Sequence, residues 1–298
     1  MNEINLNSLI NEFLSEIESV KRYSANTISS YKIDLTQFQK FTEEKNISTI
    51  RQVSEKTIKH YLIHLNQLQL SKSTVSRKLS SLRSFFDFII QSIEDIENPA
   101  KRIKNPKFKR KLPEIINLDS FLKIITFIDE DQDVFRRNLN KTIFELLYGC
   151  SLRVTELCDL NIHDVDFSKN TVKVLGKGSK YRIVPLGSKS SEIIKEYFDQ
   201  RKNITASNHF LVSKDGNTID RWYVYRVVKK YIGKENDIEK KSPHVLRHSS
   251  ATEMLNKGAD LMAVKEILGH QNLSTTQIYT QVSIEQLKKT YKSAHPKS

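Results

Sequence analysis

The sequence predicts a mainly α-helical chain with a small antiparallel sheet, organised as an N-terminal helical bundle followed by a larger C-terminal domain. Three observations lead to this prediction. Apolar residues recur at helical spacing through residues 1–100, a basic segment then breaks the pattern, and a glycine-containing hairpin follows among further helical stretches. A length of 298 residues is sufficient for two domains.

Four amphipathic segments make up the predicted N-terminal domain, residues 1–100. They run from Leu6 to Ile17, from Thr27 to Phe41, from Ser54 to Leu68 and from Ser73 to Ile90. Segments of this kind favour a compact helical bundle.

The last of these segments separates apolar from basic positions. Its expected buried face consists of Val75, Leu79, Leu82, Phe86 and Ile89. Its basic residues, which we expect on another surface, are Lys72, Arg77, Lys78 and Arg83. They are candidates for binding a polyanion, and for Arg77 and Arg83 the alternative is simple solvation of a helix face.

A basic segment, residues 101–113, marks the predicted boundary between the domains. Between Lys101 and Lys111 seven residues are Lys or Arg and none is acidic, and Pro106 lies among them. We interpret this segment as an interdomain linker. Residues 114–298 then form the second domain, which we expect to be mostly helical, with its sheet between His163 and Pro185.

Within that sheet, residues 172–175 and 181–185 alternate as two strands of a hairpin. The tip presents Lys177 between two glycines. Taken alone, Lys177 is an ordinary hairpin lysine, and Lys180 and Arg182 are solvated alternatives in the same hairpin.

The last third of the chain carries a second set of charged and aromatic residues. A helix from about His244 to Asn256 would place His244 and Arg247 on one face, because they are three residues apart. After a stop at Gly258, a further helix with its apolar stripe would end at Gly269, so that His270 projects from a turn.

A short helix is expected to follow. Ser274 and Gln277 have the spacing of a capping box, and Leu273 and Ile278 that of a hydrophobic staple. Tyr279 would then lie about one turn inside a fixed helix.

An upstream pair completes the set. Arg153 falls near a predicted helix start, and Glu156 lies one turn later, where it can orient the guanidinium. The alternative for Glu156 is an ordinary ion pair at a helix end.

Taken together, these motifs resemble the tyrosine recombinase (phage integrase) family, and within it the Xer recombinases that resolve chromosome dimers. The six positions that match the family's active site in order and spacing are Arg153, Lys177, His244, Arg247, His270 and Tyr279. Glu156 matches a supporting acidic position. One departure is Ser151, which stands where the family usually has glycine.

The resemblance implies an N-terminal core-binding, SAM-like domain and a C-terminal catalytic domain that cuts and rejoins DNA through a covalent 3′-phosphotyrosyl intermediate. Tyr279 would be the nucleophile and Lys177 the general acid, while His244 and His270 are the candidates for moving the tyrosine proton. A guanidinium group can donate two parallel hydrogen bonds to phosphate oxygens, so Arg153 and Arg247 are the candidates for holding the scissile phosphate. No cofactor is required.

The composition agrees with a DNA partner. Forty-eight Lys and Arg against thirty-five Asp and Glu give a formal net charge of +13. The resemblance further implies a homo- or hetero-tetramer on two DNA sites, linked by a terminal helix containing Ile284, Leu287 and Tyr291, and activation by a septal DNA translocase. With two cysteines and no long apolar run, we expect a cytoplasmic protein without disulfides or membrane spans.

Other functions remain as alternatives. A mobile-element integrase or a type IB topoisomerase would use the same tyrosine chemistry, and a catalytically silent architectural protein would keep only DNA binding. A zinc site at His244 and His248 lacks the accompanying ligands, and we expect His248 to pack in the core instead. Paired acids for a two-metal nuclease and a Walker-type phosphate loop are both missing from the motifs, so no metal is expected.

Overall fold

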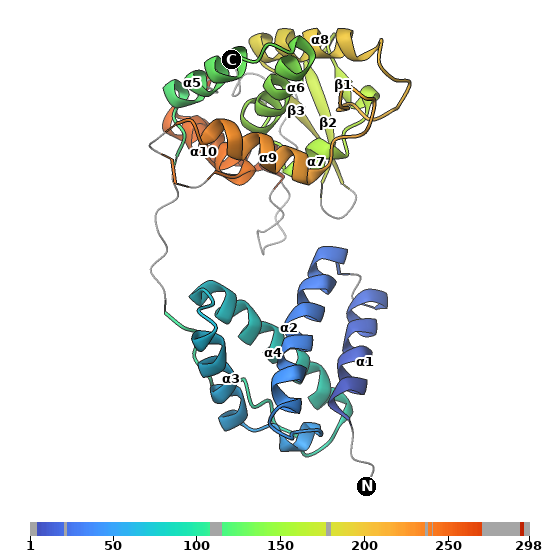
Figure 1. Ribbon diagram of the computed structural model, residues 1–298, viewed down its shortest axis with the longest axis vertical. Coiled ribbons are helices and arrows are strands. Elements are labelled where there is room, and N and C mark those ends of the chain that lie inside the picture. Colours follow the sequence, from blue (N-terminus) through green and yellow to red (C-terminus); the bar gives the residue numbers. More distant parts are fainter. Residues whose placement is uncertain are drawn as a thin grey trace. The chain divides into compact units, whose positions relative to one another are not determined.

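The computed structural model describes residues 5–20, 23–107, 115–176, 180–235, 238–239, 241–269 and 293–294. The chain divides into two compact units, Met1–Lys111 and Leu112–Ser298 (Figure 1). Each unit has its own cluster of buried apolar residues.

The first unit is built from four helices that coincide with the four predicted segments. They are α1 (Leu6–Ser19), α2 (Ala25–Glu43), α3 (Glu55–Gln67) and α4 (Lys72–Ser92), with a short 3-10 turn at Ile50–Gln52. Serine side chains fix where three of them begin, since Ser24, Ser54 and Ser71 each accept a hydrogen bond from a backbone N–H in the first turn. The predicted apolar stripe of α4 is buried.

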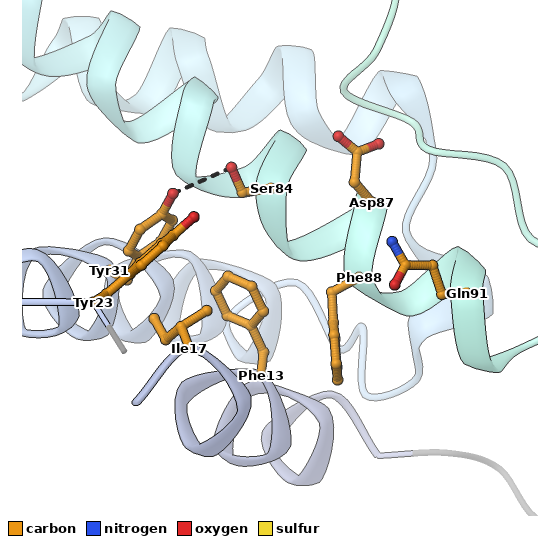
Figure 2. Close-up of a pocket in the computed structure, with 8 residues that line it drawn as sticks. All are labelled: Phe13, Ile17, Tyr23, Tyr31, Ser84, Asp87, Phe88 and Gln91. Atoms are coloured by element: carbon orange, nitrogen blue, oxygen red, sulfur yellow. Dashed lines mark hydrogen bonds between the residues drawn. The ribbon is translucent and has the colours of Figure 1, made fainter. Parts of the chain in front are cut away.

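An open pocket of about 180 Å³ lies on this unit between α1, α2 and α4 (Figure 2). Phe13, Tyr31 and Phe88 form its aromatic wall, and the Tyr31 hydroxyl donates a 3.2 Å hydrogen bond to Ser84. None of the predicted site residues lines this pocket.

The second unit is mostly helical with one small sheet, as predicted. Over the described residues of this unit, the helices are α5 (Leu118–Asp129), α6 (Val134–Phe144), α7 (Val154–Cys158), α8 (Ser188–Arg201), α9 (Arg221–Ile232), α10 (Pro243–Asn256) and α11 (Leu261–Leu268). A π-helical turn, Glu145–Gly149, follows α6, and a 3-10 turn, Ile162–Asp164, precedes the sheet.

The sheet has three antiparallel strands in the order β1 (Val165–Asp166), β2 (Thr171–Leu175) and β3 (Tyr181–Pro185). In its register Val172 lies opposite Val184, and Leu175 lies opposite Tyr181. Helix α11 packs against β3, and α10 packs against the π-helical turn. These two contacts bring the beginning of α10 and the end of α11 to the segment that carries Arg153.

Candidate active site

Arg153 lies at the start of α7 and is held by Glu156, the pairing that their spacing predicts. The Glu156 carboxylate accepts one hydrogen bond from the Arg153 backbone N–H at 2.7 Å and another from its Nη1 at 2.6 Å. Arg153 Nη2 also donates to the carbonyl of Gly269 at 3.1 Å. The Arg153 side chain is 31% exposed, so it is fixed while still reaching the surface.

Arg247 reaches the same carboxylate from α10. Its guanidinium donates to the backbone carbonyls of Ser151 and Leu268, and its Nη1 lies 3.5 Å from Glu156 Oε2. Burial, and secondly the positive charge of Arg153, lowers the pKa of Arg247 to about 9, which leaves it protonated at neutral pH. The structure thus brings Arg153, Glu156 and Arg247 together.

Arg182 on β3 is the third guanidinium at this carboxylate. It makes a bidentate pair with Glu156, both hydrogen bonds measuring 2.8 Å, and its Nε donates to the Ile267 carbonyl at 2.8 Å. Its side chain is only 9% exposed. The expectation that Arg182 is a solvated hairpin residue is therefore wrong.

The signal that could have identified Arg182 is strand periodicity. Residues two apart on a strand share a face of the sheet, and Val184, two residues after Arg182, is fully buried. An arginine on the buried face of a strand requires a partner.

The charge of Glu156 depends on these guanidinium groups. Burial by itself would raise the pKa of this carboxyl, but the ion pair with Arg182 and then the hydrogen bonds from Arg153 lower the pKa to about 2. Glu156 is consequently ionised at any pH near neutrality.

Ser151, the departure from the family pattern, has a positive backbone φ of 52°. Glycine adopts that conformation without strain, which explains why the family favours glycine here. In this chain the Ser151 hydroxyl donates to the hydroxyl of Ser250 on α10 at 2.8 Å, and the side chain is buried.

The remaining predicted residues are divided between described and undescribed parts of the chain. His244 is exposed in the first turn of α10, one turn before Arg247. His248 is exposed as well, so the expectation that it packs in the core is wrong. Lys177, His270 and Tyr279 lie outside the described residues, as do the expected short helix from Ser274 and the expected terminal helix containing Ile284, Leu287 and Tyr291.

The predicted basic positions of α4 have different environments. Lys72 is exposed, and the Arg77 side chain is 47% exposed although it pairs with Asp34. Lys78 is 4% exposed and lies 2.8 Å from the buried Asp34 carboxylate, which corrects the expectation that it occupies an open surface.

Arg83, the fourth of these residues, is engaged within its own unit. Its guanidinium donates to the carbonyls of Ala100 and Ile103 and to the Asn105 side chain. It therefore ties α4 to the segment that follows it. Contact of these α4 residues with DNA stays a prediction.

Three general features concern cysteines, metals and membranes. Cys150 and Cys158 are both free. Among the described residues, no group of three or more His, Cys, Asp or Glu side chains is placed to hold a metal ion. Within that same part of the chain, no helix combines the length and apolar character needed to cross a membrane.

Solved structures resemble the chain over most of its length. One is the XerH site-specific recombinase bound to a palindromic difH substrate in a post-cleavage complex, with a TM-score of 0.71 and 25% identity over 87% of this chain and 78% of that one. Another is the Tn1549 transposon integrase in complex with a circular intermediate DNA, with a TM-score of 0.73 and 19% identity over 90% of this chain and 92% of that one. At 19% identity the second likeness shows the fold alone.

Sequence comparisons extend over both units. The chain is 36% identical to tyrosine recombinase XerC of Halalkalibacterium halodurans, over 99% of this chain and 100% of that protein, and 35% identical to tyrosine recombinase XerD of Staphylococcus epidermidis, over 98% and 100%. A model of the phage integrase N-terminal SAM-like domain matches residues 10–92, and a model of the phage integrase family matches residues 115–286. The chain therefore belongs to the phage integrase family, among the Xer-like tyrosine recombinases, which cut and rejoin DNA.

Proposed function

We propose that the chain is a site-specific recombinase that cuts and rejoins double-stranded DNA through a covalent 3′-phosphotyrosyl intermediate, and that it resolves chromosome or plasmid dimers. The observation that carries the proposal is the meeting of Arg153 and Arg247 at Glu156, although Arg247 and Glu156 are 91 residues apart in the sequence. Two fixed guanidinium groups side by side are suited to a phosphate with two non-bridging oxygens.

The proposed chemistry starts with the Tyr279 hydroxyl. A phenol with an ordinary pKa of about 10 is ionised to roughly one part in a thousand at neutral pH, which is a deficit of about 4 kcal/mol. His244 and His270 are the groups proposed to accept that proton or to donate a hydrogen bond to the phosphate. Attack by Tyr279 leaves the DNA joined to the tyrosine through its 3′-phosphate. Lys177 protonates the departing 5′-oxygen.

The strand is rejoined by the reverse reaction. The phosphotyrosyl bond keeps the energy of the broken phosphodiester until a 5′-hydroxyl attacks it and releases Tyr279. The cycle uses only groups of the protein and of the DNA, so no cofactor is needed. The two arginines would stabilise the negative charge that gathers on the phosphate in each five-coordinate state.

In the proposed domain organisation, residues 1–100 form the core-binding domain, residues 101–113 a basic linker and residues 114–298 the catalytic domain. Exposed Lys72 and Arg77 are the α4 residues best placed to meet phosphates. The formal charge of +13 favours a polyanionic partner, and binding should weaken with salt as counterions are released.

Assembly and regulation follow the family pattern in this proposal. The enzyme would act in the cytoplasm as a homo- or hetero-tetramer on two DNA sites, with the terminal helix that contains Leu287 linking neighbouring protomers. A septal DNA translocase would activate it. Chromosome or plasmid dimers are the proposed substrates because full-length relatives are named XerC and XerD.

The first experiment traps the intermediate. DNA that remains covalently attached to the protein in its own cells is sequenced to obtain the site, and a nicked duplex carrying that site is then incubated with purified protein. Wild type should form a covalent protein–DNA adduct. Tyr279→Phe should bind the same duplex without an adduct, and an adduct formed by that variant would overturn the assignment of the nucleophile.

A second experiment separates recombination from related activities. Exchange between two sites on different duplexes is expected of the recombinase. Relaxation of a supercoiled plasmid carrying one site, without exchange, would indicate a topoisomerase. Binding without any adduct would indicate an architectural protein.

A further inference from the structure

We propose that Arg182 is a positioning residue of the active site, which fixes Glu156 and, through it, Arg153, while holding the turn that leads to His270. This inference deepens the proposed function and rests on it. Arg182 lies on β3, whereas its partners lie on α7 and at the end of α11, so that one side chain connects three elements.

The pairing of Arg182 with Glu156 is the one contact in the cluster in which two guanidinium nitrogens reach the two carboxylate oxygens. Both Glu156 oxygens accept from Arg182, at 2.8 Å each, in the bidentate arrangement that a guanidinium and a carboxylate favour. Arg153 approaches the same two oxygens with its backbone N–H and its Nη1. Because the carboxylate is held by Arg182, Arg153 is directed by a fixed group and not by a side chain that is free to rotate.

The second contact reaches the segment before His270. Arg182 Nε donates to the Ile267 carbonyl, while Arg247 donates to the carbonyl of Leu268 and Arg153 to that of Gly269. Three successive carbonyls at the end of α11 are thus each held by a different arginine. This arrangement would set the direction in which the chain leaves α11.

Close packing supports the same role. Gly269 has a φ of +60°, and a Cβ at this position would lie 3.1 Å from Arg182 Cδ and 3.2 Å from its Nη1. The turn therefore rests directly on the Arg182 side chain. A shorter side chain at 182 would remove the bidentate contact from the carboxylate and the packing contact from the turn.

The role differs from that of a buried structural arginine elsewhere in the same unit. Arg201 is 2% exposed, but its guanidinium donates to the carbonyls of Ser207, His209 and Phe210, and none of these hydrogen bonds reaches Arg153, Glu156 or Arg247. Arg201→Met is therefore the matched control for loss of a buried guanidinium.

The test measures single-turnover formation of the covalent adduct on the nicked duplex at saturating DNA, at a temperature where thermal melting shows every variant folded. Arg182→Met should cleave about 10- to 100-fold more slowly than wild type, since small displacements of catalytic groups have effects of that size. Its affinity for the duplex should change by no more than about twofold. Arg201→Met should cleave at the wild-type rate.

A double-variant cycle tests whether Arg182 acts through Glu156. If it does, adding Arg182→Met to a Glu156→Gln protein should lower the rate by a clearly smaller factor than in the wild-type background, because the bidentate pair is already broken and only the support of the turn at Gly269 is left to lose. A fall as large as in the wild-type background would overturn the proposal, and so would a wild-type rate for Arg182→Met.

The pH profile provides a readout that general destabilisation would not change. Arg153, Arg182 and Arg247 face Glu156 from α7, β3 and α10. Loss of Arg182 should allow Glu156 to take up a proton at higher pH, so the ratio of the variant's cleavage rate to that of wild type should fall on acidification from pH 7 to about 5. Effects of pH on groups that both proteins share cancel in this ratio. Parallel profiles would contradict the proposal.

Arg182→Lys covers the case in which Arg182→Met does not fold. Lysine keeps the charge but cannot form the bidentate pair. The cleavage rate of Arg182→Lys should therefore lie between those of wild type and Glu156→Gln. A wild-type rate for Arg182→Lys would count against the inference. The proposed function is tested separately, because it requires that wild type forms the covalent adduct and that Tyr279→Phe does not, whatever the result at Arg182.

Discussion

The hydroxyls of Ser151 and Ser250 lie 2.8 Å apart and join the segment before α7 to α10. The same two segments are joined a second time, because the Ser151 carbonyl accepts from Arg247. Ser151 is thus held at both its side chain and its backbone while it occupies a left-handed conformation that costs a non-glycine residue about 1–2 kcal/mol.

Two substitutions at Ser151 should separate strain from hydrogen bonding. Ser151→Ala keeps the strained backbone and loses the hydroxyl contact, so it should lower the free energy of unfolding by about 1 kcal/mol. Ser151→Gly loses the same contact but relieves the strain, so its stability should remain within about 0.5 kcal/mol of wild type. Urea unfolding of the three proteins measures both. Equal losses in the two variants would show that backbone strain at this position is negligible.

Acid stability should depend on Glu156. Its pKa is about 2 in the folded protein against an ordinary 4.5, so its ion pairs stabilise the fold above pH 4.5 and lose their effect as pH falls toward 2. The difference in free energy of unfolding between wild type and Glu156→Gln should accordingly be constant from pH 5 to 7 and shrink below pH 4.5. A difference that grows on acidification would contradict the assigned ion pairs.

The two arginines proposed to hold the scissile phosphate should respond differently to lysine. Arg247 is buried and donates to two backbone carbonyls through two different nitrogens, whereas lysine has one nitrogen, so Arg247→Lys should reduce the free energy of unfolding by about 2–3 kcal/mol as well as slowing cleavage. Arg153 is 31% exposed, so Arg153→Lys should slow cleavage with a smaller loss of stability. Chemical denaturation tests the predicted losses of stability, and the rate of adduct formation on the same preparations tests the predicted losses of cleavage.

Lysines 72 and 78 of α4 should have separate effects. Lys78→Met would leave the Asp34 carboxylate buried with less compensation, and we expect a loss of about 3 kcal/mol in stability. Lys72 is exposed, so Lys72→Met should leave stability unchanged and reduce the slope of log affinity against log salt by about 0.9 if it contacts a phosphate. An unchanged slope would remove Lys72 from the DNA interface.

Local patterns in the sequence predicted much of this fold. The four helices of the first unit, the hairpin, α10, and the end of α11 at Gly269 all depend on contacts between near neighbours, such as caps and apolar periodicity. The pairing of Arg153 with Glu156 was equally accessible, because the two residues are three apart.

The two errors among charged residues have a common physical cause. Arg182 pairs with a carboxylate 26 residues earlier, and Lys78 with one 44 residues earlier, so neither contact exists until helices and strands have packed. A charged side chain carries no sequence mark that distinguishes a buried ion pair from a solvated position. The alternation of side chains between the two faces of β3 was the one local indication of a buried position, and it concerned Arg182.

The ion pairs around Glu156 join three guanidinium groups to one carboxylate, which leaves two positive charges in excess. A phosphodiester carries a single negative charge, whereas its five-coordinate state approaches two. With the scissile phosphate held by Arg153 and Arg247 as proposed, electrostatic attraction would increase as the tyrosine attacks, so that the surplus favours the reacting geometry over intact DNA. By cancelling one of the three positive charges, Glu156 would thus set how much more strongly the cluster binds the five-coordinate state than the intact phosphodiester.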